Sequence, residues 1–210
     1  MPTGVTMNPA TAQAIVLDTS VFTNPSVAQA FGADTDRALE VFTDLARQVP
    51  ERVIFYMPPS IFAELETFTD PQRLPPDFEF ILHMQAPKRD EIKVPGSYLY
   101  ELIEDVRGRV DRGLRVAEKA VREVQPSSVE KSITRLRDRY REALRTGLLD
   151  STEDLDVILL AHELGAAVCS ADGGLMRWAE RIGLRLITPE RLRGILEQLI
   201  EHRAAGQQGL

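Results

Sequence analysis

Short, wholly apolar runs alternate with amphipathic helical segments in this chain, and this alternation restricts its fold more than any other sequence feature. The run at residues 14–18 (AIVLD) is typical of a parallel strand that is buried on both faces. Residues 53–56, 166–170 and 184–187 are further strand candidates, with helical patterns between them. Strands separated by helices predict a mostly parallel sheet flanked by helices on both faces, so we expect an α/β fold.

Residues 98–147 have a different pattern. From Leu99 onward the apolar residues recur in steps of three and four, which predicts one long amphipathic helix. Pro126 ends this pattern, and a capping box at Ser127 and Glu130 begins a second helix that ends near Gly147. We therefore expect an antiparallel helical hairpin at 98–147, inserted into a discontinuous domain formed by 14–97 and 148–202.

The charge of the chain is divided unequally. Its net charge is −7, with 25 basic and 32 acidic residues. The predicted hairpin has 12 basic and 9 acidic residues (+3), whereas the remainder has 13 and 23 (−10). Ten of the hairpin's basic residues are Arg, which favours forked recognition of phosphate or carboxylate. The bases that we expect to contact the phosphates of a nucleic acid are Arg107, Arg109, Arg112, Arg115, Lys119 and Arg122, with Arg135, Arg137, Arg139, Arg141 and Arg145 on the second helix. Because acids alternate with these bases, ordinary salt bridges along the helices are the competing interpretation.

Several classes of protein are excluded by composition and motif. A single cysteine, Cys169, rules out a disulfide scaffold and a cysteine-based zinc site. There is neither a signal-peptide pattern nor an apolar run of the length needed to span a membrane, which predicts a cytoplasmic protein without membrane contact. No P-loop and no Gly-x-Gly-x-x-Gly motif is present. A haloacid dehalogenase phosphatase would need a second Asp where Ser20 stands.

Five aspartates are candidates for metal-assisted chemistry. Asp18 ends the first predicted strand and Asp172 follows another, so both should lie at the carboxyl edge of the sheet. Asp150, Asp154 and Asp156 surround the start of a predicted helix, where capping and compensation of the helix dipole are an alternative role. Clustered carboxylates need a cation, and oxygen ligands select Mg²⁺ or Mn²⁺. Such an ion supports hydrolysis of a phosphodiester.

Four short motifs, in order, resemble those of PIN nucleases. They are 17–21 (LDTSV), 59–65 (PSIFAEL), 156–161 (DVILLA) and 170–172 (SAD). In that superfamily the Asp of the first motif binds metal with support from the Ser/Thr, and the second motif contributes a Glu, here Glu64. The resemblance implies a PIN-like domain that carries the hairpin as an insertion.

A closer resemblance covers roughly residues 15–187. It rests on five segments: 17–25, 56–60, 113–118, 140–145 and 149–156. These are similar to the protein-only ribonuclease P family of bacteria and archaea, the homologues of the Aquifex enzyme known as HARP. This resemblance implies an endoribonuclease that removes the 5′ leader from precursor tRNA. It also implies dimers that assemble through the hairpin into a large homo-oligomer, such as a dodecamer. The metal-site acids that it implies are Asp18, Glu64, Asp150, Asp154, Asp156 and Asp172.

Two alternatives stay open at this point. A PIN ribonuclease of the toxin or ribosomal RNA-processing type would use the same acids but lacks so long a hairpin. A non-catalytic PIN scaffold would have no need for a complete set of acids, and it would not bind Mn²⁺.

Overall fold

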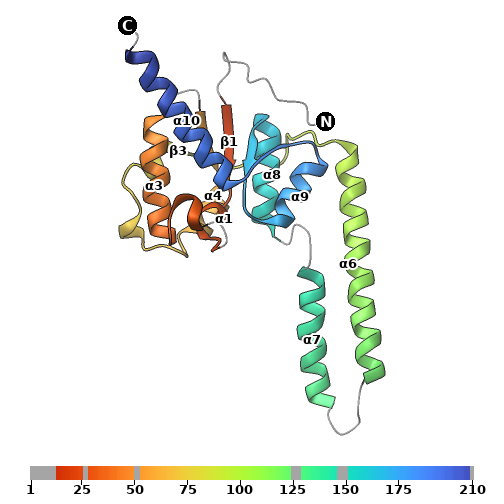
Figure 1. Cartoon of the computed structure of the whole chain (residues 1–210). Coiled ribbons are helices and arrows are strands. Elements are labelled where there is room, and N and C mark those ends of the chain that lie inside the picture. The colour runs from red at the N-terminus through yellow and green to blue at the C-terminus, as the bar shows by residue number, and fades with distance from the viewer. Residues whose placement is uncertain (1–12, 26–27, 50–52, 124–128, 146–150, 209–210) are drawn as a thin grey trace. The chain divides into compact units, whose positions relative to one another are not determined.

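The chain divides into two compact units. The computed structural model describes residues 13–25, 28–49, 53–123, 129–145 and 151–208. The first unit comprises Met1–Ile92 together with Ser151–Leu210, and the second comprises Lys93–Asp150 (Figure 1). Each unit is described below on its own.

A five-stranded parallel sheet forms the centre of the first unit. Its strands are β1 Gln13–Leu17, β2 Val53–Met57, β3 Leu82–Met84, β4 Ala167–Cys169 and β5 Arg185–Ile187. The spatial order is β3-β2-β1-β4-β5, and every neighbouring pair is parallel. The expected parallel sheet is therefore confirmed, with β1 at its centre. Strand β3 was not predicted, because three residues are too few to establish a periodic pattern.

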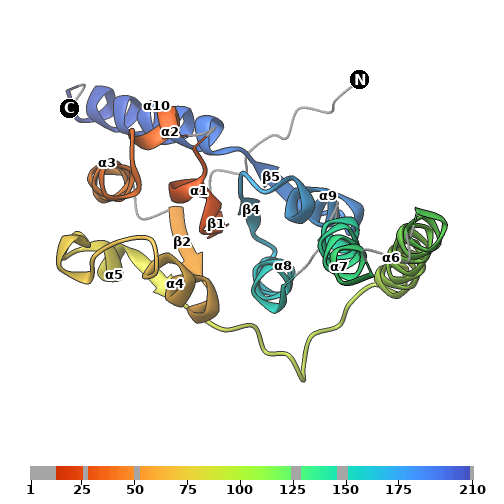
Figure 2. The same ribbon diagram turned by 90° about the horizontal axis from the view of Figure 1, so that it is seen from below.

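Helices cover both faces of this sheet (Figure 2). Those of the first unit are α1 Ser20–Thr23, α2 Ala28–Phe31, α3 Thr35–Gln48, α4 Pro59–Leu65, the 3₁₀ helix η1 Pro71–Arg73, α5 Phe78–Ile81, α8 Thr152–Leu164, α9 Gly173–Arg181 and α10 Pro189–Gln208. Helix α10 packs on α2 and α3, whereas α4 packs on α8, which in turn contacts β1 and β4. Strand β1 lies between these layers, and its last three residues, Ile15, Val16 and Leu17, are apolar and buried.

The turn from α8 into β4 requires a glycine. Gly165 caps the helix in the left-handed conformation, at φ 59°, where a side chain would be strained. The Ala166 N–H then donates to the Ala161 carbonyl at 2.9 Å. Strand β4 begins at Ala167, directly after this turn. The turn therefore sets the position of β4 and of Ser170 and Asp172 that follow it.

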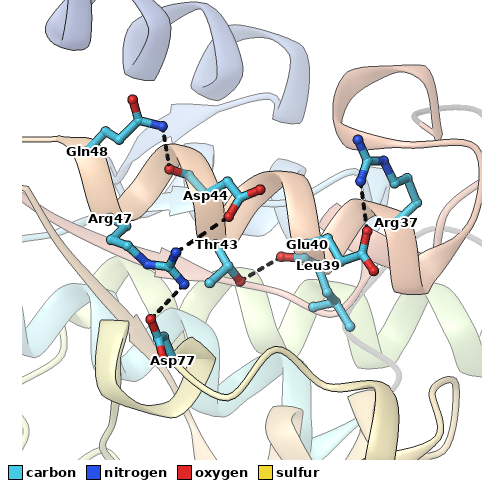
Figure 3. Close-up of polar contacts among 8 residues, drawn as sticks. All are labelled: Arg37, Leu39, Glu40, Thr43, Asp44, Arg47, Gln48 and Asp77. Atoms are coloured by element: carbon cyan, nitrogen blue, oxygen red, sulfur yellow. Dashed lines mark hydrogen bonds and ion pairs between the residues drawn. The ribbon is translucent and has the colours of Figure 1, made fainter.

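Helix α3 shows how an amphipathic segment satisfies its exposed side (Figure 3). Arg47 pairs with Asp77 of the loop before α5 at 2.6 Å and with Asp44 one turn back at 3.7 Å. The Thr43 hydroxyl, on the buried side, donates to the Leu39 carbonyl at 2.6 Å. Exposed pairs of this kind contribute little stability each, so burial of the apolar face holds α3 in place.

The final helix is longer than the sequence indicates. The predicted domain ends at residue 202, yet α10 continues to Gln208. Arg203 lies beyond that predicted end and donates to the Gln48 carbonyl at 3.0 Å, which ties the last turns of α10 to the end of α3. Helix α10 thus extends beyond the apolar pattern from which the end at residue 202 was predicted.

The second unit is a pair of antiparallel helices, α6 Gly96–Glu123 and α7 Val129–Arg145. A Cβ on Gly113 would meet the Tyr140 ring at 2.6 Å, so the glycine permits a close approach of the two helices. Arg139 pairs with Glu123 at 2.9 Å, and Arg112 Nε donates to the Ala143 carbonyl at 3.2 Å. The expected hairpin of two helices is confirmed. The predicted boundary residues Pro126, Ser127 and Gly147 lie outside the described residues.

Candidate active site

Asp18 leaves the carboxyl end of β1 and lies almost fully buried, with 4% of its surface exposed. Its N–H donates to the Cys169 carbonyl at 3.1 Å, which continues the β1–β4 ladder by one residue. Oδ2 accepts hydrogen bonds from the Ser20 hydroxyl, from the Ser20 N–H at 3.3 Å and from the Ser170 hydroxyl at 2.7 Å. One carboxylate oxygen is thus held by donors from two different segments.

Burial raises the pKa of the Asp18 carboxyl above its usual value, and the negative charge of Asp172 raises it further. The hydrogen bonds from Ser20 and Ser170 act in the opposite direction, because they favour the ionised form. A nearby cation would relieve both the burial cost and the repulsion between the two acids. This carboxylate therefore suits a metal-binding position.

Two serine hydroxyls connect the ends of β1 and β4. Ser20 Oγ and Ser170 Oγ lie 3.1 Å apart, and each also accepts a backbone N–H at 2.8 Å, from Ala171 and Asp172 respectively. Ser170 is 1% exposed. The sequence resemblance indicates a supporting role for Ser20, but it assigns none to Ser170. Its position in the SAD segment beside Asp172 is the signal that could have identified it.

Asp172 follows β4 and caps helix α9. Its Oδ1 accepts the N–H groups of Gly174 and Leu175, both at 2.7 Å. This bond pattern is that of an N-cap, so the residue has a structural role in any case. Its charge nevertheless acts on Asp18, and both residues lie at the carboxyl edge of neighbouring parallel strands.

Asp156 lies on α8, where 4% of its surface is exposed. The Arg89 guanidinium forms a forked ion pair with the Asp156 carboxylate. Nε and Nη2 donate to Oδ1 at 3.1 and 2.8 Å, and Nη2 also donates to Oδ2 at 2.7 Å. The Ser60 hydroxyl of α4 donates to Oδ2 at 2.9 Å. Sequence reasoning missed Arg89, because it lies in an irregular segment outside any motif.

Glu64 is joined to the end of β1 through Thr19. The buried Thr19 hydroxyl is 3.2 Å from Glu64 Oε2 and 3.3 Å from the Ile61 carbonyl. Glu64 itself is exposed on α4. The loop after β1 therefore contacts both α4 and the end of β4.

The remaining candidate acids flank the start of α8. The Asp154 N–H donates to the Ser151 hydroxyl at 3.0 Å, so Ser151 rather than an acid caps the helix. The Asp154 side chain is half-buried in the first turn. Asp150 lies outside the described residues.

In the described residues, hydroxyl groups of Ser and Thr bond the candidate acids individually, and the carboxylates themselves do not form a compact cluster. Among residues 13–25, 28–49, 53–123, 129–145 and 151–208, no three His, Cys, Asp or Glu side chains gather closely enough to hold a metal ion. The donor chemistry still fits a hard divalent cation, since the donors gathered here are carboxylate and hydroxyl oxygens.

The six bases predicted to contact RNA differ in their surroundings. Arg107 pairs with Glu104 at 3.3 Å, and the half-buried Arg109 pairs with Asp105 at 3.0 Å. Lys119 lies 3.9 Å from Glu123, while Arg112 bonds a carbonyl of α7. Arg115 and Arg122 are exposed and form no ion pair within the described part of the chain. Helical salt bridges therefore account for three of these six bases.

No helix among the described residues combines the length and the apolar character that crossing a membrane requires.

Comparison with known proteins agrees with this architecture. The model of a PINc domain ribonuclease family matches residues 14–201. An RNA-free ribonuclease P of Pyrococcus abyssi is 46% identical over 188 residues, which cover 89% of this chain and 92% of the relative. That of Nitrosococcus oceani is 44% identical over 191 residues, or 89% and 96% of the two chains. That of Halorhodospira halophila is 46% identical over 186 residues, or 88% and 89%. The resemblance seen in the sequence is thereby confirmed: the chain belongs to the PINc domain ribonucleases and, among them, to the RNA-free ribonuclease P family.

Proposed function

We propose that this chain is a metal-dependent endoribonuclease that removes the 5′ leader from precursor tRNA by water attack on one phosphodiester. The observation that carries the proposal is the buried Asp18, held by Ser20 and Ser170 beside the charge of Asp172. This carboxylate lies at the sheet edge where α/β proteins place their active sites. The relatives named RNA-free ribonuclease P support the choice of substrate, and precursor tRNA implies action in the cytoplasm.

The proposed cofactor is Mg²⁺, with Mn²⁺ as a substitute. The acids that we propose to hold it are Asp18, Glu64, Asp150, Asp154, Asp156 and Asp172. When bound, such an ion supplies an activated water and neutralises charge at the phosphodiester. The chain's own part is to orient the carboxylates of Asp18 and Asp156, through the hydroxyls of Ser20, Ser170 and Ser60.

We propose that the second unit contacts RNA through its exposed bases. Arg115 and Arg122 are seven positions apart and therefore share a face of α6. Both have a guanidinium that no acid of the described residues neutralises, which leaves it available to phosphate. Arg107, Arg109, Arg112 and Lys119 remain candidates, although each already has a partner on α6 or α7.

We further propose that the hairpin brings copies of the chain together. The two helices leave many large apolar side chains exposed: Leu99, Leu102, Ile103, Val106, Val110, Leu114, Val121, Val129, Ile133 and Tyr140. Exposed apolar surface of this extent is typical of an interaction site. Dimers that assemble into a dodecamer remain a prediction, which the hydrodynamic size of the protein would test.

The test of the function is cleavage of a 5′-extended precursor tRNA in Mg²⁺, with the cut position mapped. Asp154→Ala and Asp18→Asn are the site variants, and Asp44→Asn is the matched control, an exposed acid of α3. We expect a single cut at the mature 5′ end that both site variants lose and the control retains. Scattered cuts in many RNAs would indicate a toxin-type or ribosomal RNA-processing nuclease. Absence of both cleavage and Mn²⁺ binding would indicate a non-catalytic scaffold.

A further inference from the structure

Asp156 has a guanidinium as its counter-ion. Arg89 donates to both of its oxygens, at 2.8 and 2.7 Å from the same Nη2, while Nε adds a third hydrogen bond at 3.1 Å. The two partners differ in exposure: the Asp156 side chain is 5% exposed and that of Arg89 is 64% exposed. The hydrogen bonds with Asp156 raise the pKa of the already basic Arg89, so its positive charge is permanent.

The backbone around Arg89 is anchored separately. The Lys88 N–H donates to Glu163 Oε2 at 2.8 Å, and the Gln85 N–H donates to the Met57 carbonyl at 3.1 Å. Glu163 and Asp156 are seven residues apart and therefore lie on the same face of α8. This irregular segment consequently runs along α8 and delivers Arg89 to Asp156 from a fixed position.

Burial of a carboxylate carries a desolvation cost, which the ion pair with Arg89 offsets. Removing the partner leaves a desolvated charge that Ser60 alone, with one hydroxyl donor, would have to stabilise. The same guanidinium opposes a divalent cation, because two positive charges that share one carboxylate repel each other. Arg89 therefore orients the Asp156 carboxylate and also weakens the binding of a divalent cation to it.

We propose that Arg89 is a positioning residue that holds the Asp156 carboxylate and competes with the divalent cation for it, thereby setting the cation concentration that the nuclease requires. This inference rests on the proposed function, since it takes Asp156 as a metal ligand. The opposing idea, that Arg89 binds the scissile phosphate, fits less well. Its fork is already directed onto a carboxylate that compensates its charge.

The experiment measures Mn²⁺ binding to the full-length protein after chelator treatment, from the electron paramagnetic resonance signal of free Mn²⁺. Arg89→Gln removes the charge, whereas Arg89→Lys retains it without the fork. Arg73→Gln is the matched control, because Arg73 pairs with Asp36 at 3.0 Å in the same unit. Thermal melts of each variant establish that it is folded.

We expect the Mn²⁺ dissociation constant of Arg89→Gln to fall by about tenfold. Those of Arg89→Lys and Arg73→Gln should stay within about twofold of the native value. The Mg²⁺ concentration for half-maximal cleavage should fall in parallel in Arg89→Gln. An unchanged or weaker Mn²⁺ affinity in Arg89→Gln would overturn the inference, as would a raised KM for RNA without any change in metal binding. Failure of the native protein to bind Mn²⁺ at all would instead overturn the metal site itself.

Discussion

The hydroxyl of Ser170 donates to Oδ2 of Asp18 at 2.7 Å, across 152 positions of sequence. The same hydroxyl accepts the Asp172 N–H at 2.8 Å. The buried Ser170 side chain therefore fixes the orientation of the Asp18 carboxylate and also the start of the turn that carries Asp172. The SAD motif contains this serine but the resemblance assigns it no role, whereas the geometry places it between Asp18 and Asp172.

Replacement of Ser170 by Ala should lower cleavage of precursor tRNA by about 10- to 100-fold, because a partner that orients a metal ligand is lost. The protein should remain folded, since Ser20 still donates to Asp18. Thr188→Ala, which removes the hydroxyl that accepts the Arg191 N–H at the start of α10, is the control. Single-turnover cleavage rates check this prediction, and equal rates for the native and Ser170→Ala proteins would contradict it.

Replacement of Asp18 by Asn should abolish cleavage and stabilise the fold. The folded protein holds the Asp18 proton more tightly than the unfolded chain, whose carboxyl has the ordinary pKa of 3.8. Its contribution to stability is therefore complete below that value and is lost as the pH rises through the raised folded pKa. At pH 7 the neutral Asn should raise the free energy of unfolding by about 1 kcal/mol. Urea unfolding at pH 4 and pH 7 measures this, and the gain should shrink at the lower pH.

Cys169 should be inert to thiol reagents while the chain is folded. Burial raises the pKa of its thiol well above the ordinary value, and the charges of Asp18 and Glu190 add to this effect. The thiolate that would react is therefore scarce, and the side chain is fully buried. Labelling with a chromogenic disulfide should proceed only at the rate of unfolding. Rapid labelling in native buffer would show that β4 opens far more readily than the fold implies.

An acid placed on the apolar surface of the hairpin should reduce the size of the assembly. Val121→Asp charges a side chain that is 71% exposed on α6, so its effect on the isolated chain should be small. Phe80→Asp is the matched control, since Phe80 is 88% exposed but belongs to the first unit. Analytical ultracentrifugation should find smaller species for Val121→Asp alone. Equal sedimentation of both variants and the native protein would exclude this surface from the interface between copies.

The double variant Arg115→Ala, Arg122→Ala should bind precursor tRNA more weakly and with less dependence on salt. Removing one Arg–phosphate interaction reduces the slope of log K against log salt by about 0.9 for duplex and about 0.7 for single-stranded nucleic acid. Arg37→Ala, which breaks an exposed pair with Glu40 on α3, should leave the slope unchanged. Filter binding over a range of potassium concentrations provides the measurement. An unaltered slope would show that neither arginine binds the RNA.

The sequence predicts the parts of this fold that have long or strongly apolar patterns. Strand β1 and helix α6 are examples, because burial on both faces and a long amphipathic period leave few alternatives. Strand β3 and helix α5 are too short for a period, so only their tertiary packing defines them. The contact of Arg89 with Asp156 could not be predicted either, because it depends on where an irregular segment lies against α8. Asp18 and Asp172 were predictable from topology alone, because parallel strands bring their carboxyl ends to one edge.

The central position of β1 has a consequence for the order in which the chain is made. This strand is synthesised first, yet it pairs with β4, whose residues follow the whole hairpin. During most of translation, Asp18 therefore lacks its hydrogen bond from Ser170, and the edge of β1 that pairs with β4 has no partner strand. A nascent chain that has emerged only as far as the hairpin therefore holds β1 without β4 beside it and Asp18 without the hydroxyl of Ser170.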